Sequence, residues 1–205
     1  SGSLLWYVQY NQVSSINDIG ACIAADSTGN IYVCGTSGFN FGPYDIVTIK
    51  YNSDGIQQWA KIYASPGNID EGVTDLATDK SDNIYVCGGS GEPNNTGAAF
   101  VLKYNTQGDT VWVRRNSPTG YRAGFNSMKL DNSDDIYLTG NYDTVRVIPP
   151  IQSYHGFTAK YDSSGTLFWL QKYNTGISNQ FNKLVLDKVG NVYVAGNSRS
   201  SVNDS

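Results

Sequence analysis

The chain has 205 residues, of which 16% are charged, and it carries 22 glycines, 15 tyrosines and 4 tryptophans with a formal net charge of −4. Many aromatic residues and few charges favour an all-β fold. The acidic balance, without a cluster of Lys and Arg, excludes nucleic-acid binding. The apolar runs have the length of strands, which excludes direct membrane insertion by helices.

Two sequence motifs recur along the chain at an almost constant interval. The first reads Gly-Asn-Ile-Tyr-Val-Cys-Gly at residue 29, and variants of it begin at residues 82, 134 and 190, so that the four copies start 53, 52 and 56 residues apart. The second reads Lys-Tyr-Asn-Ser-Asp-Gly-Ile-Gln-Gln-Trp at 50–59 and recurs at 103–112 and 160–169. Trp6 lies 53 residues before Trp59. Two motifs in one phase indicate a tandem structural repeat.

Each period contains four short alternating runs separated by Gly, Asn and Asp, which is typical of four antiparallel strands. We therefore predict a β-propeller made of four-stranded antiparallel blades, of which residues 1–205 form a single segment with about 3.75 blades of a larger propeller. In chain order, the predicted elements are an outermost strand, three complete blades and a partial blade: 4–10, 21–63, 73–116, 125–173 and 183–197.

The partial blade has no third strand, so strand 4–10 cannot complete it without leaving an unpaired lane. We therefore expect the open edges to be covered by the remaining blades of a larger chain or by other copies of this chain.

The run Asp-x-x-Gly-Asn-Ile-Tyr-Val-Cys-Gly from Asp26, followed by Lys-Tyr-Asn-x-x-Gly-x-x-x-Trp, resembles the bacterial SBBP-type β-propeller repeat. The resemblance covers essentially the whole chain, although the third copy has Asp134 and Asp135 in place of Gly-Asn. SBBP repeats occur mainly in secreted or surface-displayed bacterial proteins. The resemblance therefore implies a secreted or cell-surface location, and it implies no particular activity.

The three cysteines lack the Cys-x-x-Cys spacing of zinc and redox sites. If a hairpin pairs Asp26 with Asn30, Cys22 lies directly opposite Cys34 on the next strand. That arrangement leaves two alternatives open, a cross-strand disulfide or two buried thiols. In the next repeat Asp75 takes the position opposite Cys87.

The short turns of the repeat are uniform, whereas its other connections are long and dissimilar. The Asp-x-x-Gly-Asn turns suit tight hairpins better than calcium loops, and all the uniform turns fall at one end of the blades. The dissimilar connections fall at the opposite end, where loops on a rigid scaffold commonly carry recognition. The predicted ligand-binding residues at that end are Phe39, Phe41, Tyr44, Asp70, Glu71, Tyr121, Arg122 and Tyr154.

These patterns predict a non-catalytic binding or scaffolding module that recognises a protein or glycan partner through its loops. The sequence predicts no catalytic residue, cofactor or metal, and His155 is the only histidine. One alternative is a multivalent lectin whose repeated tryptophans stack on sugars, although such aromatics usually pack between blades. The other is a glycan hydrolase or lyase with paired carboxylates from Asp70, Glu71 and Asp75, although hydrogen bonding at a blade face is expected for Asp75.

Overall fold

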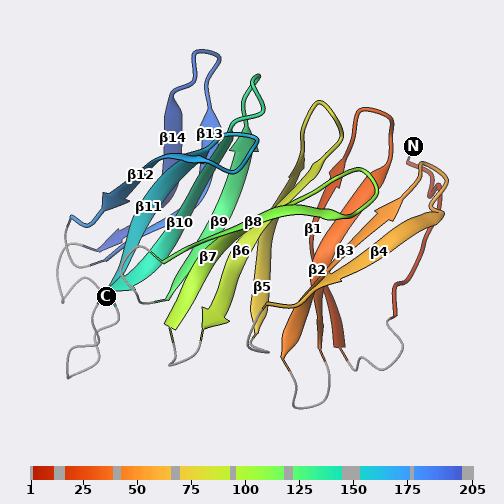
Figure 1. The fold of residues 1–205 in the computed structure, drawn as a ribbon, viewed down its shortest axis with the longest axis horizontal. Coiled ribbons are helices and arrows are strands. Elements are labelled where there is room, and N and C mark those ends of the chain that lie inside the picture. Colours follow the sequence, from red (N-terminus) through yellow and green to blue (C-terminus); the bar gives the residue numbers. More distant parts are fainter. Residues whose placement is uncertain are drawn as a thin grey trace.

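The computed structural model describes residues 2–11, 17–38, 43–65, 70–92, 96–117, 122–144, 153–175 and 178–199. The described chain is all-β with antiparallel strands, as predicted (Figure 1). Within these ranges no helix is long and apolar enough to cross a membrane. The strands are β1 Asn17–Ala25, β2 Ile31–Gly38, β3 Tyr44–Tyr51, β4 Gln57–Tyr63, β5 Glu71–Thr78, β6 Ile84–Glu92, β7 Thr96–Tyr104, β8 Thr110–Asn116, β9 Ala123–Leu130, β10 Ile136–Thr144, β11 Ser153–Tyr161, β12 Leu167–Tyr173, β13 Ser178–Leu186 and β14 Val192–Arg199.

The strands group into four sequential units that follow the repeat. Unit 1 is the sheet β1-β2-β3-β4, unit 2 comprises β5 to β8, unit 3 comprises β9 to β12, and unit 4 is the pair β13-β14. Each strand pairs antiparallel with the next strand of its own unit. One bridge, between Gly89 and Gly124, joins units 2 and 3 into a single curled eight-stranded sheet.

The units fan out side by side, with the first strand of each unit against the first strand of the next. β1 contacts β5, β5 contacts β9, and β9 contacts β13. The hairpin tips gather at the upper end of the view in Figure 1, and the strand ends that lead into the dissimilar connections lie at the lower end. The described hairpin turns therefore lie at one end of the units, as predicted. We call these the turn end and the loop end.

A β-bulge interrupts the pairing of each first strand, and in units 2 and 3 it directs one side chain at the following unit. The pairing skips one residue of each first strand, and in units 2 and 3 these residues are Thr74 and Asn126. Thr74 Oγ1 donates to the carbonyl of Phe125 at 2.7 Å, and Asn126 Nδ2 donates to the carbonyl of Phe181 at 2.7 Å. Bulges commonly redirect a side chain in this way. Because the bulge lets the first strand continue, β1 begins at Asn17, before the predicted start at 21.

The glycine that closes the first sequence motif has a steric cause at the bulge. A Cβ on Gly88 would lie 1.9 Å from the carbonyl oxygen of Gly72 on the paired strand. The same overlap with a main-chain oxygen would occur at each equivalent position of the other units, namely Gly35, Gly140 and Gly196. Only glycine allows the two strands to approach so closely.

The turn aspartates serve the hairpins. Asp26 Oδ1 accepts the backbone N–H groups of Thr28 and Asn30 at 3.0 and 2.8 Å, and Oδ2 accepts the Tyr32 hydroxyl at 3.0 Å. Burial alone would raise the pKa of Asp26, but these hydrogen bonds outweigh it and lower the pKa to about 2. Asp79 and Asp187 bind their own hairpins through the same backbone and tyrosine donors.

The repeated tryptophans connect each unit to the next. Trp59 Nε1 donates to the carbonyl of Thr106, in the turn between β7 and β8, at 3.1 Å. Its indole covers Gly108 of that turn so closely that an added Cβ would lie 2.9 Å from the ring. We call this the tryptophan–turn contact. Two other pairs repeat it, Trp6 with Ser53 and Trp112 with Ser163.

Residues 2–11 do not form the strand predicted at 4–10. No strand among the described residues pairs with this segment, and an isolated strand has no ladder hydrogen bonds to hold it. Trp6 still makes the tryptophan–turn contact and lies 6.2 Å from the ring of Tyr51. The segment therefore keeps the side-chain contact of an outermost strand without its backbone pairing.

The glycine at the bulge gives a direct test of this packing. Gly88→Ala places a methyl group against the Gly72 carbonyl and is expected to lower the free energy of unfolding by about 1–3 kcal/mol. Gly72→Ala is the matched control, because its Cβ would lie 3.9 Å from the Gly89 oxygen. Urea unfolding followed by tryptophan fluorescence measures both variants, and equal losses of stability would contradict the steric explanation.

Candidate binding site at the loop end

The described loop-end residues predicted from the sequence lie at three successive junctions between units. At the junction of units 1 and 2, Asp70 Oδ1 accepts the backbone N–H of Tyr44 at 2.9 Å. At the junction of units 2 and 3, Arg122 lies against Gly97, the repeat equivalent of Tyr44. At the junction of units 3 and 4, the Tyr154 N–H donates to Ser178 Oγ at 3.3 Å. Phe39, Phe41 and Tyr121 lie outside the described residues.

The same position of the repeat therefore carries different chemistry at each junction. The residue four positions before the bulged residue of the first strand is Asp70 in unit 2, Arg122 in unit 3 and Ser178 in unit 4. Each lies beside the start of the third strand of the preceding unit. The loop end thus presents a row of three junctions whose charge changes from acidic to basic to neutral.

Glu71 is buried behind Asp70 at the first of these junctions. Its side chain is 4% exposed, and Oε1 accepts the backbone N–H of Ser65 at 2.8 Å. Oε2 and the Ser65 hydroxyl have no hydrogen-bond partner among the described residues. Burial raises the pKa of Glu71 and the nearby Asp45 raises it further, against the opposing effects of Ser65 and Arg115. Burial also raises the pKa of Asp45.

Arg115 from β8 supplies the positive charge of this junction. Its Nη1 donates to Ser90 Oγ at 3.0 Å and its Nη2 donates to the Tyr63 hydroxyl at 3.4 Å. The guanidinium therefore bridges units 1 and 2, and its charge stabilises the ionised form of Glu71. The sequence analysis missed Arg115, Asp45 and Ser65. The sequence does contain one signal for Arg115. It lies three residues after Trp112, and the equivalent position of unit 1 is the apolar Ile62, so a charged residue replaces an apolar one there.

Two acidic residues of unit 2, Glu71 and Asp75, bond to opposite neighbouring units. Glu71 is bonded to Ser65 of unit 1, whereas Asp75 Oδ2 accepts the hydroxyl of Ser127 at 3.2 Å and the N–H of Met128 at 2.9 Å, both in unit 3. Asp75 is therefore hydrogen-bonded at a face of its sheet, as the sequence analysis expected. The carboxylates of Glu71 and Asp75 do not converge on one substrate position.

Cys34, Cys87 and His155 are buried within the sheets, and Cys22 is partly buried. Cys22 lies opposite Cys34 in the register, as predicted, and both thiols are free. The hydrogen bond with the Cys34 thiol and burial raise the pKa of Cys22. His155 is buried with Nδ1 unpartnered among the described residues, and burial lowers its pKa. Within the described ranges, no group of three or more His, Cys, Asp or Glu side chains is arranged to hold a metal ion.

Comparison with known proteins finds a family match for the first part of the chain. Residues 6–42 match the family model described as SBBP, beta-propeller repeat. This segment is therefore similar to an SBBP β-propeller repeat. The matched segment holds Trp6, the Asp26 turn and the start of the loop-end connection after β2. The motifs of this SBBP repeat recur in the three following units.

A solved structure is similar to this chain in fold. A crystal structure of a protein of unknown function from Dyadobacter fermentans DSM 18053 is similar, with a TM-score of 0.55 and 12% sequence identity. The alignment covers 89% of this chain and 66% of that one, so this chain spans just under two thirds of that protein. At this identity the likeness concerns the fold alone. A search of curated proteins finds no match.

The buried Glu71 carboxyl predicts a pH dependence of stability. Because burial raises its folded pKa above the unfolded value of about 4.3, the folded state binds this proton more tightly. The free energy of unfolding then falls as the pH rises from about 4.3 through the folded pKa. Glu71→Gln is expected to remove this part of the decline and to stabilise the chain at pH 7, measured by urea unfolding between pH 4 and 8.

Asp162→Asn is the control of opposite sign. Hydrogen bonds from Ser164 and Thr166 lower the pKa of Asp162, so its carboxylate stabilises the fold above about pH 4 and loses this effect as the pH falls. Units 1 and 2 carry Asn at the equivalent turn position, so the variant is expected to fold. An unchanged pH profile in Glu71→Gln would show that Glu71 contributes nothing to the slope.

Proposed function

We propose that the chain is a non-catalytic binding or scaffolding module in which units 1 to 3 are four-stranded blades and unit 4 is a partial blade of a larger propeller. The contacts of β1, β5, β9 and β13 in sequence support a common hub, around which the other strands point outward. The tryptophan–turn contact and the bulge hydrogen bonds recur at successive junctions, which supports one geometry for every pair of neighbours.

The loop end is the proposed recognition surface, for a protein or glycan partner. The observation that carries this proposal is the contrast between the two ends. At the turn end, the same Asp-based hairpin recurs in every unit, whereas at the loop end the equivalent junction residues are Asp70, Arg122 and Ser178. A rigid framework with changing chemistry at one end is typical of recognition by loops.

The tryptophans favour structural packing over a multivalent lectin. Trp112 is buried, and the indole N–H groups of Trp6, Trp59 and Trp112 donate to carbonyls of the next unit. An indole that covers a turn glycine has one face committed to packing. A sugar would then have to stack on partly buried rings whose donors are already used.

The carboxylates weaken the case for a glycan hydrolase or lyase. Such an enzyme needs two carboxyl groups that face one glycosidic bond, and Glu71 and Asp75 face different units. Asp70 uses one carboxylate oxygen to hold the Tyr44 backbone. We also propose a secreted or cell-surface location, on the basis of the match to the SBBP repeat.

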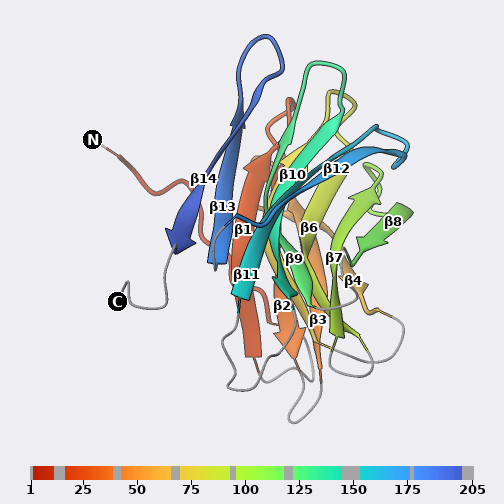
Figure 2. The same ribbon diagram turned by 90° about the vertical axis from the view of Figure 1, so that its left-hand side faces the viewer.

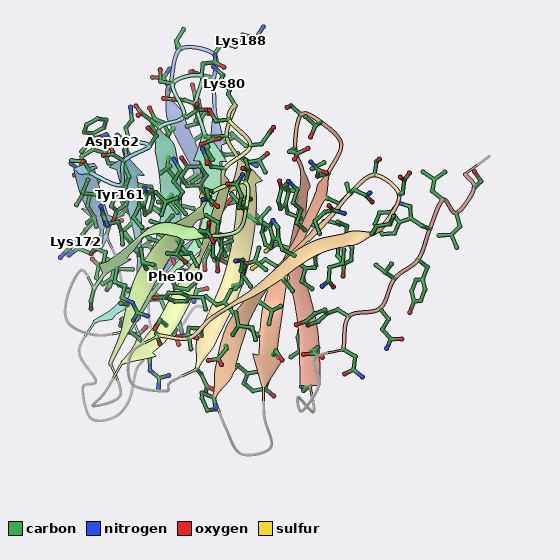
Figure 3. All side chains as sticks on the ribbon, turned by 45° about the vertical axis from the view of Figure 1, so that its right-hand side comes forward. Lys80, Phe100, Tyr161, Asp162, Lys172 and Lys188 are labelled. Atoms are coloured by element: carbon green, nitrogen blue, oxygen red, sulfur yellow. The ribbon has the colours of Figure 1, made fainter. Side chains whose placement is uncertain are left out.

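Binding at the loop end is tested with an array of defined oligosaccharides and a phage-displayed peptide library, each probed with the chain. Arg122→Glu reverses a charge at the second loop-end junction, and Lys188→Glu makes the same change in an exposed side chain at the turn end (Figure 3). The proposal predicts that Arg122→Glu weakens a selected ligand by about tenfold or more and that Lys188→Glu leaves its affinity unchanged.

A ligand that is lost on Lys188→Glu but retained by Arg122→Glu would place recognition at the turn end and contradict the proposal. Loss of a selected sugar on Trp169→Ala, with Arg122→Glu unaffected, would instead favour the lectin. The two charge-reversal variants keep the apolar contacts of the sheets, and circular dichroism checks that all three variants fold.

A further inference from the structure

Unit 1 holds two thiols that contact each other across neighbouring strands. β1 and β2 lie side by side (Figure 2), and Cys22 of β1 is directly opposite Cys34 of β2. Cys22 Sγ lies 3.8 Å from the carbonyl oxygen of Cys34. The hydrogen bond between the two thiols raises the pKa of Cys22, and burial raises it further. Both sulfur atoms therefore lie on the same face of the hairpin.

The spacing of the two strands fits a bond between these sulfurs. Directly opposite residues of an antiparallel pair have Cα atoms about 4.5 or 5.5 Å apart, depending on the hydrogen-bond pattern. Both values fall within the range of about 4.4–6.8 Å that disulfides span. The bulge next to Cys22 keeps the strands close, since a Cβ on Gly35 would overlap the carbonyl oxygen of Ile19. A disulfide therefore requires no change of register.

The thiol pair is particular to unit 1. The equivalent pairs of the other units are Asp75 with Cys87, Ser127 with Thr139 and Lys183 with Ala195. These side chains are acidic, neutral or basic, so the packing of the repeat does not require a thiol at either position. The structural duties of the repeat thus leave the pair in unit 1 unexplained.

The two thiols differ in their access to a small oxidant. Cys34 is fully buried, with its Sγ 3.2 Å from Thr48 Oγ1, whereas Cys22 is only partly buried. Cys87 is fully buried too, and burial raises its pKa. An oxidant therefore meets Cys22 first and finds Cys34 beside it. Because the thiolate is the reacting form, the raised pKa of Cys22 slows this reaction at neutral pH.

We propose that Cys22 and Cys34 form a disulfide when the folded chain meets a small disulfide oxidant such as glutathione disulfide. The Cys22 thiolate attacks one sulfur of the oxidant and releases one glutathione thiolate. The Cys34 thiolate then attacks the Cys22 sulfur of the mixed disulfide and releases the second. The two protein thiols lose two electrons and two protons, and the oxidant becomes two glutathione thiols. The structure shows the reduced form of the pair.

The bond would join the first two strands of unit 1 covalently. β1 also contacts β5 of unit 2, so the link holds a strand on which the next unit packs. Oxidising compartments, such as the secreted or cell-surface location proposed above, preserve disulfides. The inference rests on the register of β1 and β2 and not on the loop-end ligand. Its failure and a failure of loop-end recognition are therefore distinguishable.

The test follows the three thiols by mass spectrometry. The folded chain is incubated with glutathione disulfide at about pH 8, where more thiolate is present, then unfolded, alkylated and cut with trypsin. Cys22 and Cys34 lie in one tryptic peptide, 1–50, because Lys50 is the first Lys or Arg, whereas Cys87 lies in peptide 81–103. Peptide 1–50 is expected to lose two hydrogens and to escape alkylation, while Cys87 is alkylated.

Thermal unfolding measures the effect of the bond. The disulfide restricts the unfolded chain, so oxidation is expected to raise the Tm by about 5 °C or more, and dithiothreitol is expected to reverse the rise. The double variant Cys22→Ser/Cys34→Thr copies the Ser127 and Thr139 pair of unit 3 and is therefore expected to fold without any response to the oxidant. Cys87→Ala leaves the pair intact and is expected to keep the full response.

Four results would overturn the proposal. Alkylation of both cysteines of peptide 1–50, or a glutathione left on Cys22, would show that Cys34 does not reach Cys22. A cross-link between peptides 1–50 and 81–103 would show that Cys87 is the partner instead. A bond that forms only in urea would show that the folded register plays no part. A lower Tm after oxidation would show that the bond distorts the hairpin.

Discussion

The structure depends on one constraint, that each sheet carries apolar side chains on both faces and is buried only when a neighbour covers each face. Leu76 shows this on one side, because it packs against unit 1 and is 6% exposed. Its equivalent Ile23, which no preceding unit covers among the described residues, is 69% exposed. Tyr193 of unit 4, at the other end of the row of units, shows the same effect because its side chain is exposed. Apolar burial is the main source of stability in such a fold, so a unit is stable only in a row.

The repeated residues serve this stacking, which is why they carry little information on function. The motif glycine permits the bulge, the bulged residue bonds the next unit, and the motif tryptophan covers the next turn. The turn aspartate holds its own hairpin and the motif tyrosine. The residues that take no part in these repeated contacts lie at the loop end, where the three junctions differ in charge.

The strands, their order and the separation of the two ends could be predicted because turns and alternation are local signals. The prediction of a strand at 4–10 was wrong, because strand pairing depends on a neighbouring strand that the sequence of the segment does not encode. The electrostatic interaction of Glu71 with Arg115 was missed for a related reason, since 44 residues separate them and they come near each other only in the folded sheet of unit 2. The predicted site residues lie at three junctions because the repeat spaces them one unit apart.

Native-state hydrogen exchange, resolved by strand, tests the central claim most directly. If stability comes from neighbours on both faces, the amides of β6 and β10, in the two inner units, exchange only through the largest openings, while those of β14 exchange fastest and β2 lies between them. Uniform protection across the four second strands would contradict this account. So would slower exchange in β14 than in β6, because a two-stranded unit with an exposed face would then be stable without its neighbour.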